Sequence, residues 1–231
     1  MGAIRGKTRI LIVDDHPVLR EAMRNAFEQH EDMEVLGEAG DGEEAVRLTS
    51  ELKPDIVIMD IVMPKLSGID ATKQIRRVSP NTAVLVLTAY DDDRYVIGLL
   101  EAGAAGYLLK TARSSVLVDA VRTVRDGESV LHPSIIAKTL KYAQRRQVDS
   151  VEHRNGEQLT EREVEVLNLA ARGMSNIDIA GRLSLSVRTV KAHLSRIFQK
   201  MGVASRTEAV VKAAREGWLK LPALSNGDPE D

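Results

Sequence analysis

The sequence predicts an α/β domain followed by an all-α domain, and three observations carry this prediction. Between residues 8 and 127, short apolar runs alternate with stretches in which apolar residues recur every three or four positions. The alternation stops at 128–158, a segment that holds Pro133 and a polar run. From residue 159 onward only helical patterns follow. Alternating strands and helices favour a doubly wound parallel sheet of five strands with helices on both faces.

Four of the expected strands are runs of mostly apolar residues, the second, which contains Glu34, is a weaker one, and most of the expected helices begin at a residue type that favours a helix start. The expected strands are residues 10–13, 33–37, 56–59, 83–87 and 106–109. The expected helices follow Pro17, Asp41, Gly68 and the aspartates at 91–93, with a fifth around residue 120. Their expected apolar stripes include Val18, Ala22 and Phe27, then Ala45, Leu48 and Leu52, then Ile69, Thr72 and Ile75, and finally Val116, Ala120, Val121 and Val124.

The second domain, expected at 159–220, begins with a capping signal and contains three more. Thr160 and Ser205 each stand three residues before a glutamate, which is the form of a capping box, and two further serines can cap the helices between them. Two helices joined by a short turn, the second of them basic, form the helix-turn-helix pattern. We therefore expect four helices here, a linker with one short helix at 128–158, and a disordered acidic tail at 221–231.

Composition and charge exclude several classes of protein. The 231 residues include no cysteine, which removes disulfides, thiolate catalysis and cysteine-ligated zinc. No run approaches the roughly eighteen apolar residues of a membrane span, so we expect a cytoplasmic protein that binds no membrane. Residues 9–128 carry 14 Lys/Arg against 22 Asp/Glu, a net charge of −8, whereas residues 160–220 carry 11 against 6, a net charge of +5. This asymmetry favours a metal or regulatory site in the first domain and a polyanion partner for the second.

Polar residues follow four of the expected strands at the edge where open parallel sheets carry their chemistry. Asp14 and Asp15 follow the first strand, and Asp60 follows the third. Thr88 and Lys110 follow the fourth and fifth. Carboxylates that meet at one edge repel each other, and a hard divalent cation with oxygen ligands, Mg²⁺, relieves this repulsion. One carboxylate can then accept a phosphoryl group as an aspartyl phosphate.

Four stretches of the first domain match the motifs of a known family. They are Asp14-Asp15, Asp60-x-x-Met63-Pro64-x-x-x-Gly68, Thr88-Ala89 and Gly106-Tyr107-Leu108-Leu109-Lys110. With these stretches the chain resembles the receiver domain of bacterial two-component response regulators. The resemblance implies that Asp60 is phosphorylated. It implies that the ligands of Mg²⁺ are Asp14 (mostly through water), Asp15, Asp60 and the backbone carbonyl of Val62. It implies that the phosphate-binding and switch residues are Thr88, Ala89, Tyr107 and Lys110, with Tyr107 turning inward on phosphorylation.

An enzyme class with related chemistry is disfavoured. Haloacid-dehalogenase-type phosphatases also use an aspartate nucleophile at a strand end, but they require a second acid two residues later. That position is Val62 here. We therefore expect no classical enzyme, although a receiver would catalyse its own phosphoryl transfer and slow dephosphorylation.

Two stretches of the second domain carry a further resemblance. Leu159-Thr160-x-Arg162-Glu163-x-Glu165-Val166-Leu167 and Ser186-x-x-Thr189-Val190-Lys191-x-His193 resemble the LuxR-type DNA-binding domain. Together with the receiver, they make the whole chain similar to NarL/FixJ-type response regulators. The third helix is expected to bury Val187, Val190, Leu194 and Ile197 and to enter the major groove with its other face. The expected DNA-binding residues are Asn176, Arg188, Thr189, Lys191, Ala192, Ser195 and Arg196.

The sequence therefore favours a transcription factor that is activated when a sensor histidine kinase phosphorylates Asp60. Phosphorylation is expected to favour a homodimer that reads inverted half-sites in double-stranded DNA, because one such domain offers little specific contact. RNA is a weaker alternative, since the chain holds only two Phe, four Tyr and one Trp as stacking platforms. A second alternative is a constitutive DNA-binding regulator whose receiver-like domain serves only for dimerisation.

Overall fold

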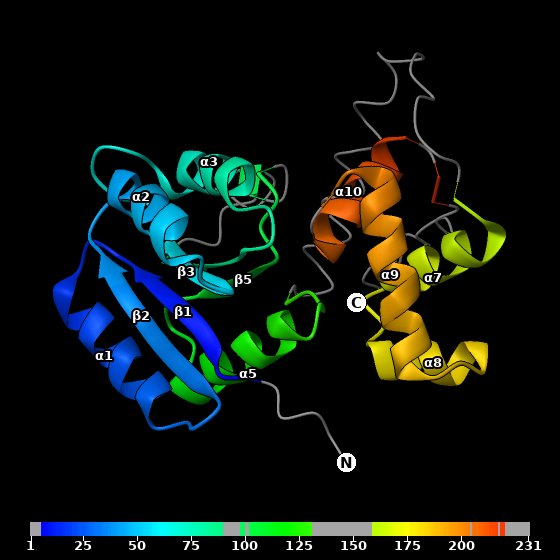
Figure 1. The fold of residues 1–231 in the computed structure, drawn as a ribbon, viewed down its shortest axis with the longest axis horizontal. Helices are drawn as coiled ribbons and strands as arrows, with labels where there is room; N and C mark the ends of the chain where they lie inside the picture. Colours follow the sequence, from blue (N-terminus) through cyan, green and yellow to red (C-terminus); the bar gives the residue numbers. More distant parts are fainter. Residues whose placement is uncertain are drawn as a thin grey trace, which may run out of the picture.

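The computed structural model describes residues 6–89, 98–99, 102–130, 159–203, 205–216 and 218–219. This part of the chain forms an α/β domain, called the receiver below after the resemblance given above, and a helical domain (Figure 1). The helix expected after residues 91–93, the short helix expected within the linker and the acidic tail lie outside the described residues. None of the described helices has the length and apolar character needed to cross a membrane.

The receiver contains a five-stranded parallel sheet, which confirms the predicted fold class. The strands are β1 (Thr8–Val13), β2 (Met33–Ala39), β3 (Ile56–Asp60), β4 (Ala83–Thr88) and β5 (Gly106–Leu109). They are arranged in the order β2-β1-β3-β4-β5. Every residue of β3 is buried, as its apolar composition predicts for a central strand covered on both faces.

Four described helices cover the two faces of the sheet. They are α1 (Pro17–Glu28), α2 (Gly42–Leu52), α3 (Gly68–Val78) and α5 (Ser114–Arg125). Helices α2 and α3 pack on one face and α1 and α5 on the other (Figure 1). Alternate strand residues supply the two cores: Val57 and Met59 pack in the core under α2 and α3, whereas Ile56 and Ile58 pack against α1 and α5.

The expected apolar stripes of α1 and α5 are partly wrong. Val18 is 79% exposed and Val116 is 45% exposed, whereas Met23 and Leu117 are buried. Both valines lie in the first turn of their helix, where the face next to the core is set by the angle at which the helix packs. The spacing of apolar residues along the sequence does not determine that packing angle.

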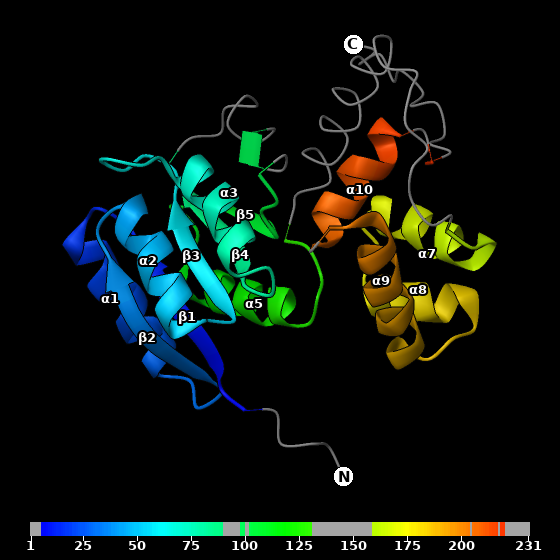
Figure 2. The ribbon, with the colours of Figure 1, turned by 45° about the horizontal axis from the view of Figure 1, so that its top comes forward.

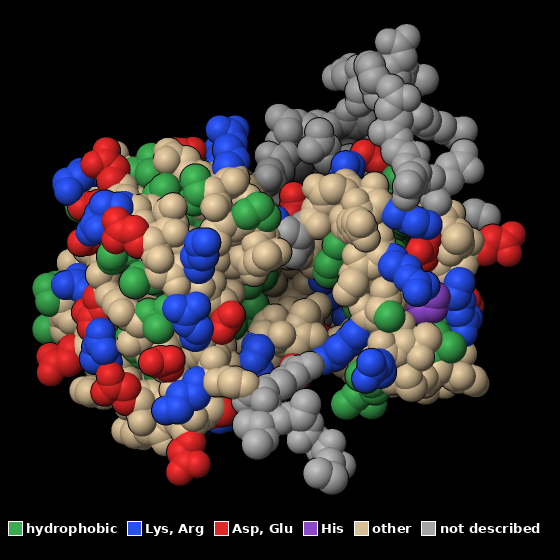
Figure 3. All heavy atoms as spheres, viewed as in Figure 1, with side chains coloured by type: hydrophobic (Ala, Val, Ile, Leu, Met, Phe, Trp, Pro, Cys, Tyr) green, Lys and Arg blue, Asp and Glu red, His purple; other side chains and the backbone are tan. Residues whose placement is uncertain are grey.

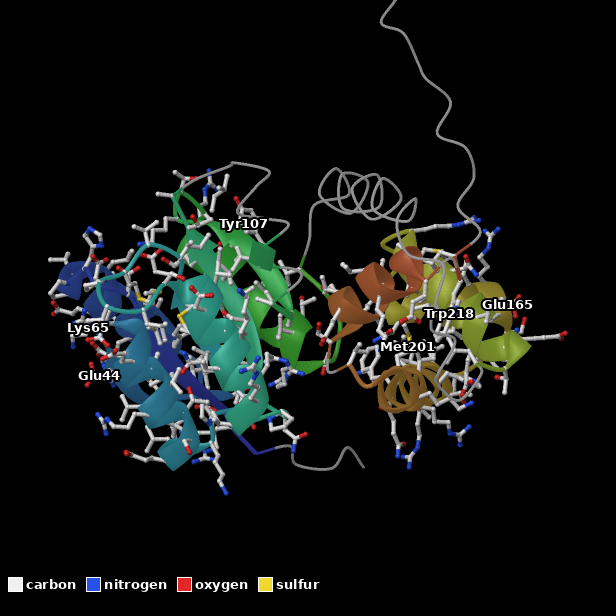
Figure 4. The ribbon with its side chains drawn as sticks, turned by 90° about the horizontal axis from the view of Figure 1, so that it is seen from above. Glu44, Lys65, Tyr107, Glu165, Met201 and Trp218 are labelled. Atoms are coloured by element: carbon white, nitrogen blue, oxygen red, sulfur yellow. The ribbon has the colours of Figure 1, made fainter. Side chains whose placement is uncertain are left out.

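The helical domain consists of four described helices, as predicted. They are α7 (Glu161–Ala171), α8 (Asn176–Leu183), α9 (Val187–Met201) and α10 (Arg206–Arg215). Ser186 caps α9, and Gly202, with φ +62°, ends it, because a left-handed residue stops a helix and favours glycine. Val190 and Ile197 are buried as expected, but Val187 is 36% exposed at the start of the helix. Met201 and Trp218 lie within this domain (Figure 4).

Glu163 connects the start of α7 to α9, and its replacement by glutamine is expected to weaken the helical domain. Its carboxylate accepts hydrogen bonds from the Thr160 backbone N–H at 2.8 Å and from Lys200 Nζ at 2.7 Å. Burial disfavours the charge, but these donors outweigh burial and hold the pKa of Glu163 below its usual value. Glutamine keeps the capping bond and loses the charge, so Glu163→Gln should cost about 1–2 kcal/mol at pH 7.

The same contact should make this cost depend on pH. A lowered pKa contributes stability that is present above the ordinary glutamate pKa and is lost as pH falls through the lowered value. The difference between wild type and Glu163→Gln should therefore shrink toward pH 3. Urea unfolding followed by the fluorescence of Trp218, the single tryptophan of the chain, measures this domain. An equal difference at pH 7 and pH 3 would contradict the assignment.

Candidate functional site

The register of the sheet brings the ends of β1, β3, β4 and β5 to one edge. Val13 pairs with Met59, Asp60 pairs with Leu87, and Thr88 pairs with Leu109. The residues that follow or end these strands therefore lie side by side, as the sequence predicted for the carboxyl edge of a parallel sheet.

Lys110 joins two buried carboxylates at this edge. Its Nζ lies 2.7 Å from Asp14 Oδ2 and 2.8 Å from Asp60 Oδ2, and both aspartates are at most 4% exposed. Burial raises the pKa of Asp60, and the Asp14 charge acts in the same direction against the attraction of Lys110. Burial also disfavours the charge of Lys110, but its bonds to the two carboxylates outweigh burial and raise the pKa of this ammonium. The edge thus holds concentrated charge away from water.

Asp15 and His16 complete the acidic cluster. His16 Nδ1 lies 2.7 Å from Asp15 Oδ1 and 3.1 Å from Asp14 Oδ1, and the His16 backbone N–H donates to Asp14 Oδ1 at 2.9 Å. One ligand atom from each of Asp14, Asp15, His16 and Asp60 lies within 4.8 Å of the others. The sequence prediction missed His16, although its position directly after two acids was a usable signal.

Arg20, on the first helix, holds the backbone of the acidic loop. Its Nη1 donates to the Asp14 carbonyl oxygen at 2.7 Å, and its Nε donates to Glu38 Oε2 at 3.1 Å. Arg24 donates from Nε to the other oxygen of Glu38 at 2.6 Å without an observed contact to Asp14. The arginine at position 20 therefore ties the loop after β1 to the end of β2. The sequence prediction did not include this residue.

The loop after Asp60 folds back tightly over the strand end. The backbone N–H of Ile61 donates to Asp60 Oδ1 at 2.7 Å, and the side chain of Val62 is 50% exposed. Gly68 approaches so closely that a Cβ there would lie 1.9 Å from the Asp60 carbonyl oxygen. The glycine is thus required by this approach, beyond its place at the start of α3.

The remaining predicted switch residues occupy different environments. Thr88 is fully buried and Ala89 is exposed at the end of β4. Tyr107 is 7% exposed and belongs to the core cluster of the receiver. Its position on β5 is shown in Figure 4. Tyr107 is therefore already buried in this conformation. That it turns inward on phosphorylation stays a prediction.

Most of the predicted DNA-binding residues lie on the open face of α9. The exposed members are Arg188, Ala192, Ser195 and Arg196. Lys and Arg side chains gather over the visible face of the helical domain (Figure 3). Lys191 is 31% exposed, and its Nζ lies 3.5 Å from Asp126 of the receiver. Thr189 is half-buried, and its backbone N–H donates to the capping Ser186.

Asn176, expected above to be a DNA-binding residue near a helix start, stays a prediction, and its side chain is not exposed. The residue is fully buried at the first position of α8, and its Oδ1 faces Arg206 Nη1 at 3.4 Å. Its backbone N–H donates to Glu128 Oε1 at 3.0 Å.

The two domains contact each other through α10, the helix nearest the receiver (Figure 1). Thr207 Oγ1 donates to the Ala105 carbonyl oxygen at 3.3 Å, and Glu208 lies 3.8 Å from Arg76. Val211 is 7% exposed and belongs to the same hydrophobic cluster as the receiver core. These contacts hold the two domains against each other; we call this arrangement closed.

Comparisons with known proteins agree with this architecture. Residues 10–122 match the response regulator receiver domain, and residues 157–213 match the bacterial regulatory proteins of the luxR family. The chain is 41% identical over 213 residues to the uncharacterized transcriptional regulatory protein YxjL of Bacillus subtilis, covering 92% of this chain and 98% of that protein. It is 41% identical to the transcriptional regulatory protein LiaR of the same organism, covering 90% and 97%.

A solved structure of the RcsB response regulator of Salmonella typhimurium is also similar, with 25% identity and a TM-score of 0.54 over 89% of this chain and 97% of that one. The five-stranded receiver, the four-helix domain and these matches lead to one assignment. The chain belongs to the NarL/LuxR family of two-component response regulators and is a transcriptional regulator with a receiver domain and a LuxR-type DNA-binding domain.

Proposed function

We propose that a sensor histidine kinase phosphorylates Asp60 and that this phosphorylation releases the helical domain to bind DNA. The observation that carries the proposal is the pairing of Lys110 with both Asp14 and Asp60 at the buried strand edge. Such a site combines a carboxylate nucleophile with a cation positioned to meet a phosphoryl oxygen.

In the transfer, an Asp60 carboxylate oxygen attacks phosphorus and forms an O–P bond. The P–N bond to the kinase phosphohistidine breaks, and its electron pair stays on the imidazole nitrogen, which takes up a proton. Lys110 then pairs with a phosphoryl oxygen, and the Thr88 hydroxyl donates to another. The receiver supplies these groups itself, so it would catalyse its own phosphorylation and slow dephosphorylation without being a classical enzyme.

The acidic cluster fits Mg²⁺, because its carboxylate oxygens are the ligands that this ion prefers. The residues that would hold it are Asp14, Asp15 and Asp60 with the backbone carbonyl of Val62. When bound, Mg²⁺ supplies positive charge that offsets the repulsion between the carboxylates and the phosphoryl group.

Strand β5 offers a physical link from the phosphorylation site to the helical domain. Lys110 at its end faces the acceptor carboxylate. Within the strand, the Tyr107 backbone N–H donates to the Val130 carbonyl oxygen at 2.9 Å. The Ala105 carbonyl oxygen just before it accepts from Thr207 of α10. Movement of Lys110 toward a phosphoryl group would therefore act on the contacts that hold the domains closed.

Opening would take Asp126 away from Lys191 of α9 and would free α10 for a partner copy. We infer that two phosphorylated copies bind inverted half-sites, since a single helix-turn-helix domain makes few base contacts. The positive charge of the helical domain supports DNA as the partner.

The test uses the full chain with acetyl phosphate and Mg²⁺. Intact mass should rise by one phosphate in wild type and in Asp70→Ala, whose aspartate is exposed on α3, but not in Asp60→Ala. Phosphorylated wild type should form a dimer by light scattering and bind a labelled duplex more tightly by fluorescence anisotropy. DNA binding that is equal in wild type and Asp60→Ala, with and without the donor, would instead favour the constitutive regulator.

Arg20→Ala is expected to weaken Mg²⁺ binding by loosening the loop that carries Asp14. The Mg²⁺ concentration for half-maximal phosphorylation should rise about tenfold, as for other residues that orient metal ligands, while the rate at saturating Mg²⁺ changes less. Arg24→Ala is the matched control, because Arg24 shares Glu38 with Arg20 but does not hold Asp14. If both variants raise the required Mg²⁺ concentration equally, the pairing with Glu38 explains the effect and the bond from Arg20 to Asp14 does not.

A further inference from the structure

The chain that leaves α5 carries two acids that contact the DNA-binding domain. We define residues 126–130 as the interdomain segment; it lies between the two domains (Figure 2). Asp126 pairs with Lys191, and Glu128 Oε1 accepts the backbone N–H of Asn176 at 3.0 Å. Gly127 between them has φ +77°, a conformation that favours glycine and turns the chain between the two acids.

The N–H that Glu128 accepts is the first of α8. The first N–H groups of a helix have no partner within the helix, and they carry the positive end of its dipole. Ser175 caps this helix by accepting from the Asp178 N–H, and Asp178 accepts the Ser175 N–H in return. The capping box therefore satisfies other donors, and the Asn176 N–H binds an anion from another domain.

A buried cation lies behind this N–H. Arg206 is 5% exposed, and its guanidinium donates to the carbonyl oxygens of Ala170 and Met174 as well as facing the Asn176 side chain. All three acceptors are neutral. Burial lowers the pKa of Arg206 to about 10, and the Glu128 carboxylate acts against that shift. Glu128 of the interdomain segment thus supplies negative charge that favours the charged form of this buried arginine.

The Asn176 side chain adds a second donor without a partner. The residue is fully buried, and among the described residues its Nδ2 has no hydrogen-bond partner. A helix start, a buried guanidinium and an unpaired amide donor together form a site that favours an anion.

We propose that this site binds one phosphate of the DNA backbone and that Glu128 occupies it in the closed arrangement. The inference rests on the proposed function and identifies the group that DNA must displace. A carboxylate and a phosphodiester each carry one negative charge on oxygen acceptors, so the exchange keeps Arg206 neutralised. In a helix-turn-helix, the first helix crosses the DNA backbone while the second reads the groove. Glu128 contacts the first of these helices, α8, and Asp126 contacts the second, α9.

The first experiment measures DNA affinity of the unphosphorylated full chain. A phosphate contact does not depend on sequence, so a labelled random duplex at low salt is a sufficient probe. Glu128→Gln should tighten binding about tenfold, and Glu128→Ala, which also removes the acceptor, should tighten it at least as much. Asp119→Asn removes the same charge from the 74% exposed side chain of Asp119 on α5 and should leave affinity nearly unchanged.

The second experiment observes the Asn176 amide directly by ¹H–¹⁵N NMR. Loss of the Glu128 charge should move this proton resonance upfield, because a charge-assisted hydrogen bond is lost. Addition of the duplex to Glu128→Gln should move it downfield again. An Asn176 resonance that does not respond to the duplex would overturn the phosphate site.

The outcomes separate this inference from the proposed function. If Glu128→Gln and Asp119→Asn increase DNA affinity equally, the effect comes from net charge alone and the inference is overturned. If Glu128→Gln does not bind DNA more tightly but phosphorylated wild type does, the inference is overturned and the proposed function stands. No change from either would overturn both.

Discussion

Replacing Gly68 with alanine should destabilise the receiver by about 3 kcal/mol or more, because the new methyl group has no room. Its Cβ would lie 1.9 Å from the Asp60 carbonyl oxygen and 2.9 Å from the Asp60 carbonyl carbon and Ile61 Cα. These are backbone atoms, so a change of rotamer cannot relieve the overlap. The chain must shift at the proposed phosphoacceptor, and we also expect phosphorylation of Asp60 to be impaired.

The matched control is Gly181→Ala. Gly181 lies within α8, and a Cβ there would meet nothing within 4 Å. Alanine should stabilise that helix by about 0.5–1 kcal/mol. Urea unfolding followed by circular dichroism reports both domains, and Trp218 fluorescence reports the helical domain. Unfolding of Gly68→Ala at the wild-type urea concentration would contradict the close approach.

The second large effect is expected from Lys110→Met. Methionine keeps much of the side-chain volume but removes the charge that Asp14 and Asp60 share. Two buried carboxylates would then face each other without a cation, and removing one partner of a buried ion pair costs about 3–5 kcal/mol. We therefore expect a large loss of receiver stability at pH 7 in the absence of divalent cations.

Mg²⁺ should restore part of this loss, because a cation bound to the same carboxylates replaces the missing charge. Lys73→Met is the control: Lys73 is 50% exposed and pairs only with Asp70 among the described residues, and exposed pairs contribute about 0–1 kcal/mol. Thermal unfolding of both variants with and without Mg²⁺ measures the difference. A Lys110→Met protein that Mg²⁺ does not stabilise would argue against metal binding by the acidic cluster.

The sequence determined the local structure and the chemistry of the strand edge. Runs such as residues 56–59 could only be buried strands, and the charge at Asp60 therefore had to emerge where β3 ends. The caps at Thr160 and Ser186 likewise placed the starts of α7 and α9. These features were predictable because they depend on the periodicity of neighbouring residues and on hydrogen bonds within a few positions.

Only the tertiary structure decided which residues support the site. Arg20 reaches the Asp14 carbonyl across a loop, and Gly68 is required by the backbone of another element. Which face of α1 is buried also depended on how that helix packs, and for this reason Val18 was wrongly expected in its apolar stripe. None of these contacts follows from spacing along the chain.

The same distinction holds for DNA binding. The basic face of α9 could be read from helical spacing, since residues three and four positions apart share a face. Lys191 contacts Asp126, and the start of α8 contacts Glu128. These contacts follow from the docking of the two domains, because the contacting residues lie 48 or more positions apart in the sequence. Local patterns therefore predicted the groups proposed to bind DNA, and long-range packing placed Asp126 and Glu128 against two of them.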